Sequence, residues 1–446
     1  MKFAVRIAVV AGAISITSCG GSRAPGPAPA VELLAPGIAV ASFDSLWQIV
    51  SDTYVDTAFV RTRWARVADS LRPRALSITR RGELDRLLGE TLNTIPDSHF
   101  YIIPAAVAHS DSAPETDGRG TTGMSVRVSS GRPVVWRVSK GSPAELAGIR
   151  PGQTVRRIGA RNAETLLSKV AAMPEQARPR ALSQLLHSLN GALTAQVGET
   201  VVVETVAMNG ATTSRLVATP AEGRVIQYAN LPPIASQVKW ARIPGQGECV
   251  GTIAFNIWLP ALVQDLANAV DSVSHCKGIV VDLRGNPGGL GAMVMRFGGY
   301  FVDSVKSLGT MRTRQVSLKF VINPQRSRDN GSQMAPFTGP LAILVDPMTA
   351  STSEIFAAGM QRIGRARVFG ERSAGAALPA LTNRLPSGDV FVHAVADFTD
   401  PDGRRIEGAG AVPDVEVPLS IEMLSQGRDG AMEEAVRWIG SHAASR

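Results

Sequence analysis

The feature that most constrains the fold is a pair of buried strands, each of which runs directly into a tight turn. The segment Leu341–Val345 is apolar throughout and is followed by Thr349-Ala-Ser-Thr-Ser-Glu354 and then by a helical pattern of apolar residues. Upstream, the largely apolar segment Gly278–Leu283 breaks into Arg284-Gly-Asn-Pro-Gly-Gly289. Strands that are apolar on both faces are typical of parallel sheets covered by helices. The sequence therefore predicts an α/β fold with a largely parallel sheet.

The turn after the second of these strands carries a candidate nucleophile, Ser351. At a helix N-terminus, unpaired N–H groups favour the negative charge that develops on an oxygen during acyl transfer. Glycines in the other turn bring further N–H groups close, so the candidate oxyanion donors are the backbone N–H groups of Gly288, Gly289 and Thr352. The alternative is a capping box, because Ser351 and Glu354 have the spacing that satisfies the first N–H groups of a helix.

Together the two segments resemble the core of the C-terminal processing peptidases and their tricorn-like relatives. The resemblance implies a serine peptidase with a crotonase/ClpP-like spiral core. Members of the Ser–Lys kind carry a lysine in a Gly-Lys-Gly loop past the nucleophile. Here that loop reads Ser373-Ala-Gly-Ala-Ala-Leu378, with Ala376 at the lysine position, and no lysine follows Lys319. A hydrolase with this sequence needs a different base.

Of the six histidines, we expect His99 to supply that base. The others lie in the polar linker, the helical insertion, the sheet edge, a strand and the C-terminus: His109, His187, His275, His393 and His442. Tricorn-like peptidases have a Ser-His pair where the N-terminal helical domain ends, and the serine relays a hydrogen bond to a glutamate. The matching residues are Ser98, His99 and Glu407. An unperturbed imidazole would give activity that rises near pH 6.5.

Four structural parts follow from the spacing of apolar residues. Residues 41–95 are predicted to be helical, and residues 105–121 form a polar linker. Lys140–Val155 resembles part of a PDZ domain, with a short helix after Ser-Pro and a turn at Arg-Pro-Gly. The predicted parts are an N-terminal helical domain (41–104), a PDZ-like domain with a helical insertion (119–220), a peptidase core (226–420) with a hairpin from Asp389–Phe398 into 405–414, and a C-terminal helix (421–446).

The PDZ-like segment raises two possibilities. A PDZ domain binds an extended peptide by pairing it with a strand edge, and here the pairing residues would be Gly123, Met124, Ser125 and Val126. Alternatively, this domain only positions the others. The sequence leaves both readings open.

The N-terminus reads as a targeting segment. Lys2 and Arg6 precede the apolar run Ile7–Ile16, which is too short to span a bilayer. The following Ile16-Thr-Ser-Cys19 resembles a bacterial lipoprotein signal, with Cys19 as the lipidated residue, and residues 20–40 form a flexible tether. The alternative is a plain secretory signal. Either reading places the mature protein in the periplasm or cell envelope.

The two remaining cysteines flank a predicted βαβ unit. Cys249 precedes one strand and Cys276 precedes its parallel neighbour, so both lie at the same sheet edge. That placement is compatible with a disulfide in an oxidising compartment, although two buried free thiols are also compatible. We expect no metal site at His275-Cys276, because no second ligand pair accompanies it.

The composition and charge of the chain restrict the kinds of function that it can have. The net charge is +8, but the basic residues are scattered over 446 residues without a basic run, which argues against nucleic-acid binding. No phosphate or dinucleotide fingerprint is present, so we expect no cofactor. The sequence predicts an exported serine endopeptidase that acts on proteins or peptides, lipid-anchored at Cys19, of undetermined oligomeric state. The alternatives are a degenerate peptide-binding scaffold and an esterase.

Overall fold

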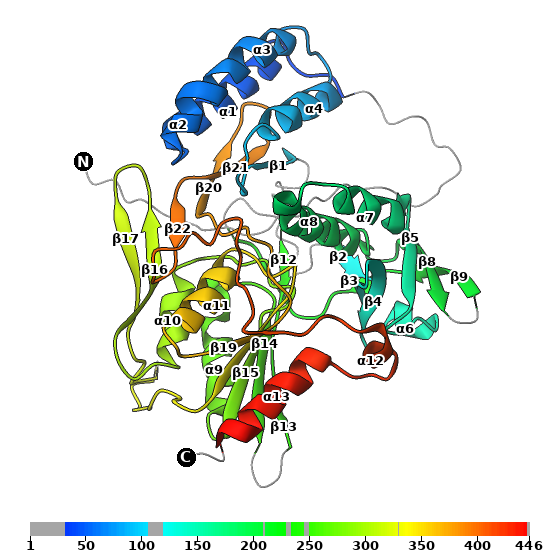
Figure 1. The fold of residues 1–446 in the computed structure, drawn as a ribbon. Helices are drawn as coiled ribbons and strands as arrows, with labels where there is room; N and C mark the ends of the chain where they lie inside the picture. The colour runs from blue at the N-terminus through cyan, green and yellow to red at the C-terminus, as the bar shows by residue number, and fades with distance from the viewer. Residues whose placement is uncertain are drawn as a thin grey trace.

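The computed structural model describes residues 32–105, 119–207, 210–228, 233–244, 249–328 and 330–443. Figure 1 shows the N-terminal helices at the top, a unit of sheet and helices on the right, and a larger core below and to the left. Cys19 lies outside the described residues. None of the described helices combines the length and apolar character needed to cross a bilayer.

The N-terminal part is helical, as predicted. Its helices bury one apolar face each, including Phe43, Leu46 and Leu84, and they pack against Phe391 of the core. The helices are α1 (Ile38–Thr53), α2 (Thr57–Phe59), the π-turn η1 (Val60–Trp64), α3 (Ala65–Ala75) and α4 (Arg81–Leu92).

A short strand joins this helical part to the core. Strand β1 (Tyr101–Ile103) pairs with β21 (Val390–Ala394), which also pairs with β20 (Ala380–Arg384). Only Phe100 separates Ser98 and His99 from β1, so this pairing positions them. The predicted hairpin from Asp389–Phe398 into 405–414 is found only in part. Its first arm is divided between β21 and β22 (Asp397–Thr399), which lie in different sheets because β22 pairs with β16 (Lys306–Arg312). A single antiparallel bridge, between Thr399 and Arg405, joins β22 to the second arm.

Residues 119–220 form an antiparallel sheet of order β3-β4-β5-β8-β9, in which β3 is an edge strand. Helix α8 packs over β3 through Leu185, Leu189 and Val126. The elements are β2 (Arg119–Thr121), β3 (Met124–Ser129), β4 (Arg132–Val138), α6 (Pro143–Leu146), β5 (Thr154–Ile158), β6 (Arg161–Asn162), α7 (Ala163–Ala171), η2 (Glu175–Ala177), α8 (Arg178–Gly191), β7 (Thr194–Gln196), β8 (Thr200–Ala207), β9 (Gly210–Val217) and β10 (Thr219–Pro220).

The core contains a six-stranded sheet of order β13-β14-β15-β18-β19-β23, parallel except for β13. Apolar residues of α9, α10 and α11 cover one face, and α13 covers the other. The elements are β11 (Arg224–Ile226), β12 (Ile234–Ser236), β13 (Val238–Ile243), β14 (Val250–Phe255), η3 (Pro260–Leu262), α9 (Val263–Val273), β15 (Gly278–Asp282), α10 (Met293–Gly299), β16 (Lys306–Arg312), β17 (Ser317–Ile322), β18 (Leu341–Val345), α11 (Thr352–Arg362), β19 (Arg367–Gly370), β23 (Val415–Glu416), α12 (Ile421–Ser425) and α13 (Gly430–Ala443).

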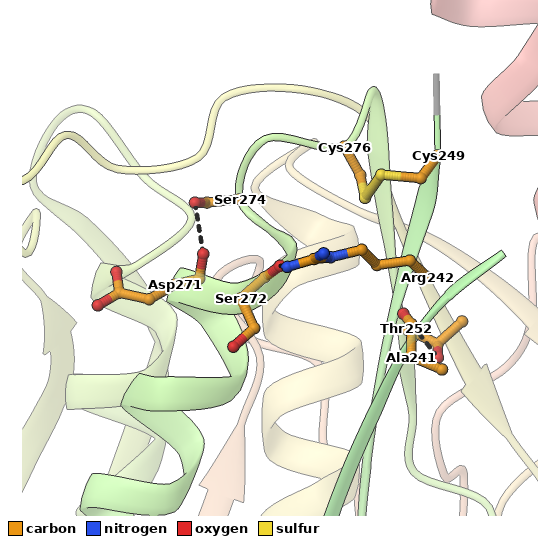
Figure 2. Close-up of a disulfide and its surroundings, with 8 residues drawn as sticks. All are labelled: Ala241, Arg242, Cys249, Thr252, Asp271, Ser272, Ser274 and Cys276. Carbon is orange, nitrogen blue, oxygen red and sulfur yellow. Dashed lines mark hydrogen bonds between the residues drawn. A yellow bond between two sulfur atoms is a disulfide. The ribbon is translucent and has the colours of Figure 1, made fainter. Parts of the chain in front are cut away.

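The predicted disulfide is present. Cys249 and Cys276 are bonded with their Cα atoms 4.8 Å apart, at the edge where β14 and β15 begin. Figure 2 shows this bond above Arg242 of β13, whose guanidinium donates to the carbonyl of Ser272 in α9. His275 lies near both sulfur atoms. Because the two sulfurs are bonded to each other, they are not thiolates that could ligate a metal.

Candidate active site

Ser351 lies at the junction between β18 and α11, in a strained conformation. Its φ of 53° and ψ of −120° are unusual for a residue with a side chain. Ser351 Oγ is buried and has no hydrogen-bond partner among the described residues. Ser351 and Glu354 have the arrangement of a capping box, as the alternative reading of the sequence expected. Ser351 N donates to Glu354 at 2.8 Å, whereas Ser351 Oγ makes no hydrogen bond of normal geometry to the helix.

Glu354 holds the loop that replaces the lysine loop. Its carboxylate accepts from Ser351 N (2.8 Å), Ser373 Oγ (2.5 Å), Gly375 N (2.7 Å) and Ala376 N (2.9 Å). Burial raises the pKa of Glu354 to about 7, against the effect of these hydrogen bonds. The glutamate thus connects the nucleophile's turn to the loop containing Ala376.

Ser98, His99 and Glu407 form one hydrogen-bonded chain. Ser98 Oγ lies 2.7 Å from His99 Nδ1 and donates to Glu407 Oε2 at 2.9 Å. Because Ser98 uses its only hydrogen on Glu407, it accepts from His99 Nδ1–H. His99 Nε2 then carries the lone pair, and this buried atom has no partner among the described residues. Glu407 is held in turn by Ser98 N (2.7 Å) and Ala377 N (2.8 Å).

His99 is 5% exposed and has a positive φ of 62°. Its burial, and secondarily the charge of Arg180, lower its pKa to about 3. Arg180 comes from α8 and donates to the carbonyl oxygens of Pro96 (3.1 Å) and Asp97 (2.6 Å). Helix α8 is therefore bonded directly to the loop that carries His99.

A small cavity of about 60 Å³ lies between α8 and these residues. Ala350 precedes Ser351, and Ala376 accepts a hydrogen bond from Ser351 N at 2.8 Å, so two neighbours of the serine line the cavity. Ser351 Oγ and His99 Nε2 are not hydrogen-bonded to each other. The lining residues are Ser98, His99, Phe100, Tyr101, Arg180, Ser183, Gln184, His187, Ala350 and Ala376.

His187 is a lining residue that the sequence analysis set aside as part of the helical insertion. On α8 it follows Arg180, Ser183 and Gln184 at spacings of seven, four and three residues, which place all four side chains on one helical face. That periodicity was visible in the sequence, but nothing in the sequence indicates that this face covers His99.

The glycine loop is attached to the nucleophile's turn. Ala350 N donates to Asn286 O (3.1 Å), and Thr352 Oγ1 donates to Gly289 O (2.8 Å). Gly289 has a φ of 139°, and a Cβ there would lie 2.3 Å from the Trp258 carbonyl oxygen, so only glycine fits. Gly288 N donates to Asn286 Oδ1 at 2.9 Å. Gly288 N is therefore occupied, and Gly289 and Thr352 remain the candidate oxyanion donors.

A buried ion pair joins β3 to the same region. Arg127 donates to Asp346 at 2.6 Å, and the other carboxylate oxygen of Asp346 accepts from Gly285 N at 2.9 Å. Asp282 and Arg284, at the end of β15 and the start of the glycine loop, form an ion pair at 2.8 Å. The sheet unit 119–220 and the core thus share charged contacts close to the candidate site.

The predicted peptide-pairing strand is the edge strand β3, but its edge is partly occupied. Asn190 of α8 accepts from Val126 N and donates to Val126 O, both at 2.9 Å. A peptide pairing at Val126 would have to displace this carboxamide. Gly123 has a φ of 77° and lies against Ser142, while Met124 is buried and Ser125 is partly buried.

Comparison with known proteins decides the family. Residues 250–417 match the profile described as "Peptidase family S41". Residues 250–417 belong to peptidase family S41. This S41 region contains Ser351, Glu354, Glu407 and the glycine loop, whereas His99 and α8 lie outside it.

Relatives match beyond the S41 region. A carboxyl-terminal-processing protease of Synechocystis sp. is 25% identical over 379 residues, which cover 84% of this chain and 80% of the relative. A chloroplastic carboxyl-terminal-processing peptidase of Arabidopsis thaliana is 24% identical, over 83% of this chain and 67% of the relative. The chain is a serine-type peptidase.

Solved structures show the same mixed α/β fold. The photosystem II D1 C-terminal processing protease has a TM-score of 0.56 at 20% identity, over 91% of this chain and 98% of that chain. Mature CPAF has a TM-score of 0.59 at 13% identity, over 90% and 96%. The tricorn protease has a TM-score of 0.50 at 15% identity, over 91% of this chain and 37% of that chain.

Proposed function

We propose that this S41 peptidase hydrolyses peptide bonds through an acyl-enzyme on Ser351, with His99 as the general base. The observation that carries the proposal is the chain His99–Ser98–Glu407, which leaves His99 Nε2 without a partner at a cavity lined by neighbours of Ser351. In this arrangement His99 takes the place of the general-base lysine that is missing from the loop at Ala376.

In the proposed reaction Ser351 Oγ attacks the peptide carbonyl carbon and its proton passes to His99 Nε2. Ser98 accepts from the resulting imidazolium, and Glu407 stabilises that charge through Ser98. The N–H groups of Gly289 and Thr352 donate to the oxyanion. His99 then protonates the leaving amine, and water hydrolyses the ester.

The cavity is too small for a substrate in this conformation, so substrate entry requires movement. A volume of about 60 Å³ accommodates a few water molecules and no peptide. We propose that residues 119–220 act as a PDZ-like domain whose displacement opens the site. The contacts that would separate are Arg180 with the loop before His99, and Arg127 with Asp346. In this reading the domain both gates and presents substrate.

The substrate class proposed is proteins cleaved near their C-termini. It rests on the names of the similar proteins and on the PDZ-like edge strand, which in other PDZ domains takes extended peptides. The proposed location is the bacterial periplasm or cell envelope, with a lipid anchor at Cys19. Replacing Cys19 with serine should release the protein from membranes, because the acyl chains supply the attachment. Unchanged membrane fractionation of that variant contradicts the anchor.

A fluorophosphonate probe tests the nucleophile directly. The wild-type protein should be labelled at Ser351, whereas Ser351→Ala should show no labelling and His99→Ala should be labelled far more slowly. Peptide hydrolysis should follow the same order, while ester hydrolysis without peptide hydrolysis would favour the esterase alternative. Labelling that is unaffected by His99→Ala would mean that another base operates. A wild-type protein that binds peptides without being labelled would support the scaffold alternative.

A further inference from the structure

The catalytic cavity contains a second histidine, and it comes from α8. His187 Nε2 is covered from solvent and has no hydrogen-bond partner among the described residues. The backbone of Met348 faces the ring and acts to raise the pKa of His187, which is the effect of a carbonyl acceptor. Since Nε2 has no partner, we assign this contact to an Nδ1–H that points to the Met348 carbonyl. His187 Nε2 is consequently a lone-pair acceptor.

Two lining residues of this cavity have a buried polar atom without a partner, His187 Nε2 and His99 Nε2. Ser351 Oγ also lacks a partner, and Ala350, which precedes it, lines the cavity. A buried polar atom without a hydrogen bond costs roughly 1–3 kcal/mol, so two such atoms at one cavity point to a shared partner. A water molecule occupies about 10–15 Å³ of such a volume, and about 60 Å³ therefore has room for it.

We propose that His187 binds the hydrolytic water and orients it for attack on the acyl-enzyme. The inference rests on the proposed acyl-enzyme at Ser351. Two acceptors suit a water molecule, because one takes the hydrogen that is transferred and the other holds the hydrogen that remains. His99 Nε2 is the first acceptor and His187 Nε2 is the second.

In the proposed deacylation, water replaces Ser351 Oγ on the acyl carbon. The water oxygen forms a bond to the acyl carbon, and one water proton moves to His99 Nε2. The second hydrogen stays on that oxygen, hydrogen-bonded to His187 Nε2. The bond between the acyl carbon and Ser351 Oγ then breaks, and His99 returns its proton to Oγ. The product acid leaves with the oxygen of the water.

If His187 binds the hydrolytic water, the active site depends on α8 remaining in the position seen in the structure. Helix α8 is bonded to the His99 loop through Arg180 and to β3 through Asn190. Acylation needs only the groups of the core and the His99 loop, whereas deacylation also needs His187. The two halves of the reaction are then separable by substitution at a single residue.

Two substitutions test the roles of the two ring nitrogens of His187 separately. In His187→Asn the amide nitrogen takes the place of Nδ1 and keeps a donor for the Met348 carbonyl, but the acceptor in the cavity is lost. In His187→Gln the amide oxygen reaches the place of Nε2 and keeps the acceptor, but the bond to Met348 is lost. The exposed His275→Gln is a matched control for a histidine substitution.

The test uses the full-length protein and a p-nitrophenyl ester, because an activated ester acylates quickly and makes deacylation limiting. His187→Asn should release one equivalent of nitrophenolate in a burst, followed by turnover slowed roughly 10- to 100-fold, the effect of one or two tenfold losses in transition-state stabilisation. KM should fall by the same factor, leaving kcat/KM unchanged. Hydroxylamine, a nucleophile that does not depend on the oriented water, should restore turnover. His187→Gln should stay close to wild type.

Other outcomes overturn the inference. If His187→Gln is the slower variant, the residue acts through Met348 as a structural anchor. If His187→Asn lowers kcat/KM while the steady-state turnover after the burst is unchanged, His187 contacts the substrate instead of water. If the wild-type protein shows a burst and His187→Asn deacylates at the wild-type rate, the water-binding role is refuted but the acyl-enzyme is not. A wild-type protein with neither a burst nor fluorophosphonate labelling refutes the acyl-enzyme as well.

Discussion

Removing the Ser98 hydroxyl tests the proposed relay most directly. In the structure this hydroxyl bonds His99 Nδ1 at 2.7 Å and Glu407 Oε2 at 2.9 Å. In Ser98→Ala, Nδ1 loses its acceptor, and nothing then favours the tautomer with its proton on Nδ1. The proton can move to Nε2, where the base must accept. By analogy with tautomer errors in serine proteases, turnover should fall about 10²- to 10⁴-fold, which is roughly 2.7–5.4 kcal/mol.

The same substitution also affects stability. Glu407 keeps its bonds from Ser98 N and Ala377 N, so the main cost is the unsatisfied Nδ1 of His99, about 1–3 kcal/mol. Tyr54→Phe is the matched control, because it removes a nearby hydroxyl that donates to Asp97 at 2.7 Å without touching the relay. Tyr54→Phe should lower the melting temperature by a comparable amount and leave kcat/KM near wild type.

The assay is peptide hydrolysis and the rate of fluorophosphonate labelling, with thermal unfolding measured in parallel. The reasoning is refuted if folded Ser98→Ala retains turnover within about threefold of wild type while Ser351→Ala is inactive, since one tenfold step corresponds to 1.36 kcal/mol. That result would leave His99 as the base but show that Ser98 does not set its tautomer.

The disulfide, the charge beside His99 and the loop at Ala376 can each be tested. Cys249 and Cys276 should resist alkylation under denaturing, non-reducing conditions, and replacing both with serine should cost roughly 3–4 kcal/mol of unfolding free energy for a loop of this length; ready labelling of the native protein contradicts the bond. Burial and Arg180 lower the pKa of His99, and the base must be neutral to act. The rise of kcat/KM with pH should therefore lie below 6.5 in wild type and move to higher pH in Arg180→Gln. A pH profile that is the same in both proteins contradicts the effect of the Arg180 charge. Ala376→Lys should lower activity instead of creating a Ser–Lys enzyme, because Glu354 fixes the backbone of residue 376 at a cavity that Arg180 already lines, so the new ammonium lies in a positively charged surrounding. A gain in turnover contradicts this.

Local sequence patterns were sufficient to predict the core. The apolar runs before Ser351 and Gly289 specify buried parallel strands, and the helical periodicities flanking them specify the covering helices. The disulfide was predictable because parallel neighbours place their N-terminal ends together. The pairing of β21 with β1 was not predictable in this way, because strand partners distant in sequence depend on packing against the N-terminal helices.

The candidate site was likewise predictable only in part. The sequence alone specifies the residue types: a serine at a helix start, glycines in the adjoining turn, a Ser-His pair, and a loop without lysine. These depend on short-range chemistry, since strand, turn and helix follow from neighbouring residues. Which of these groups meet depends on long-range packing. Ser98 and Glu407 are 309 residues apart, and α8 brings His187 and Arg180 over the same cavity. The physical reason is that burial, tautomer and pKa are properties of a surrounding assembled from distant segments, which no local pattern encodes.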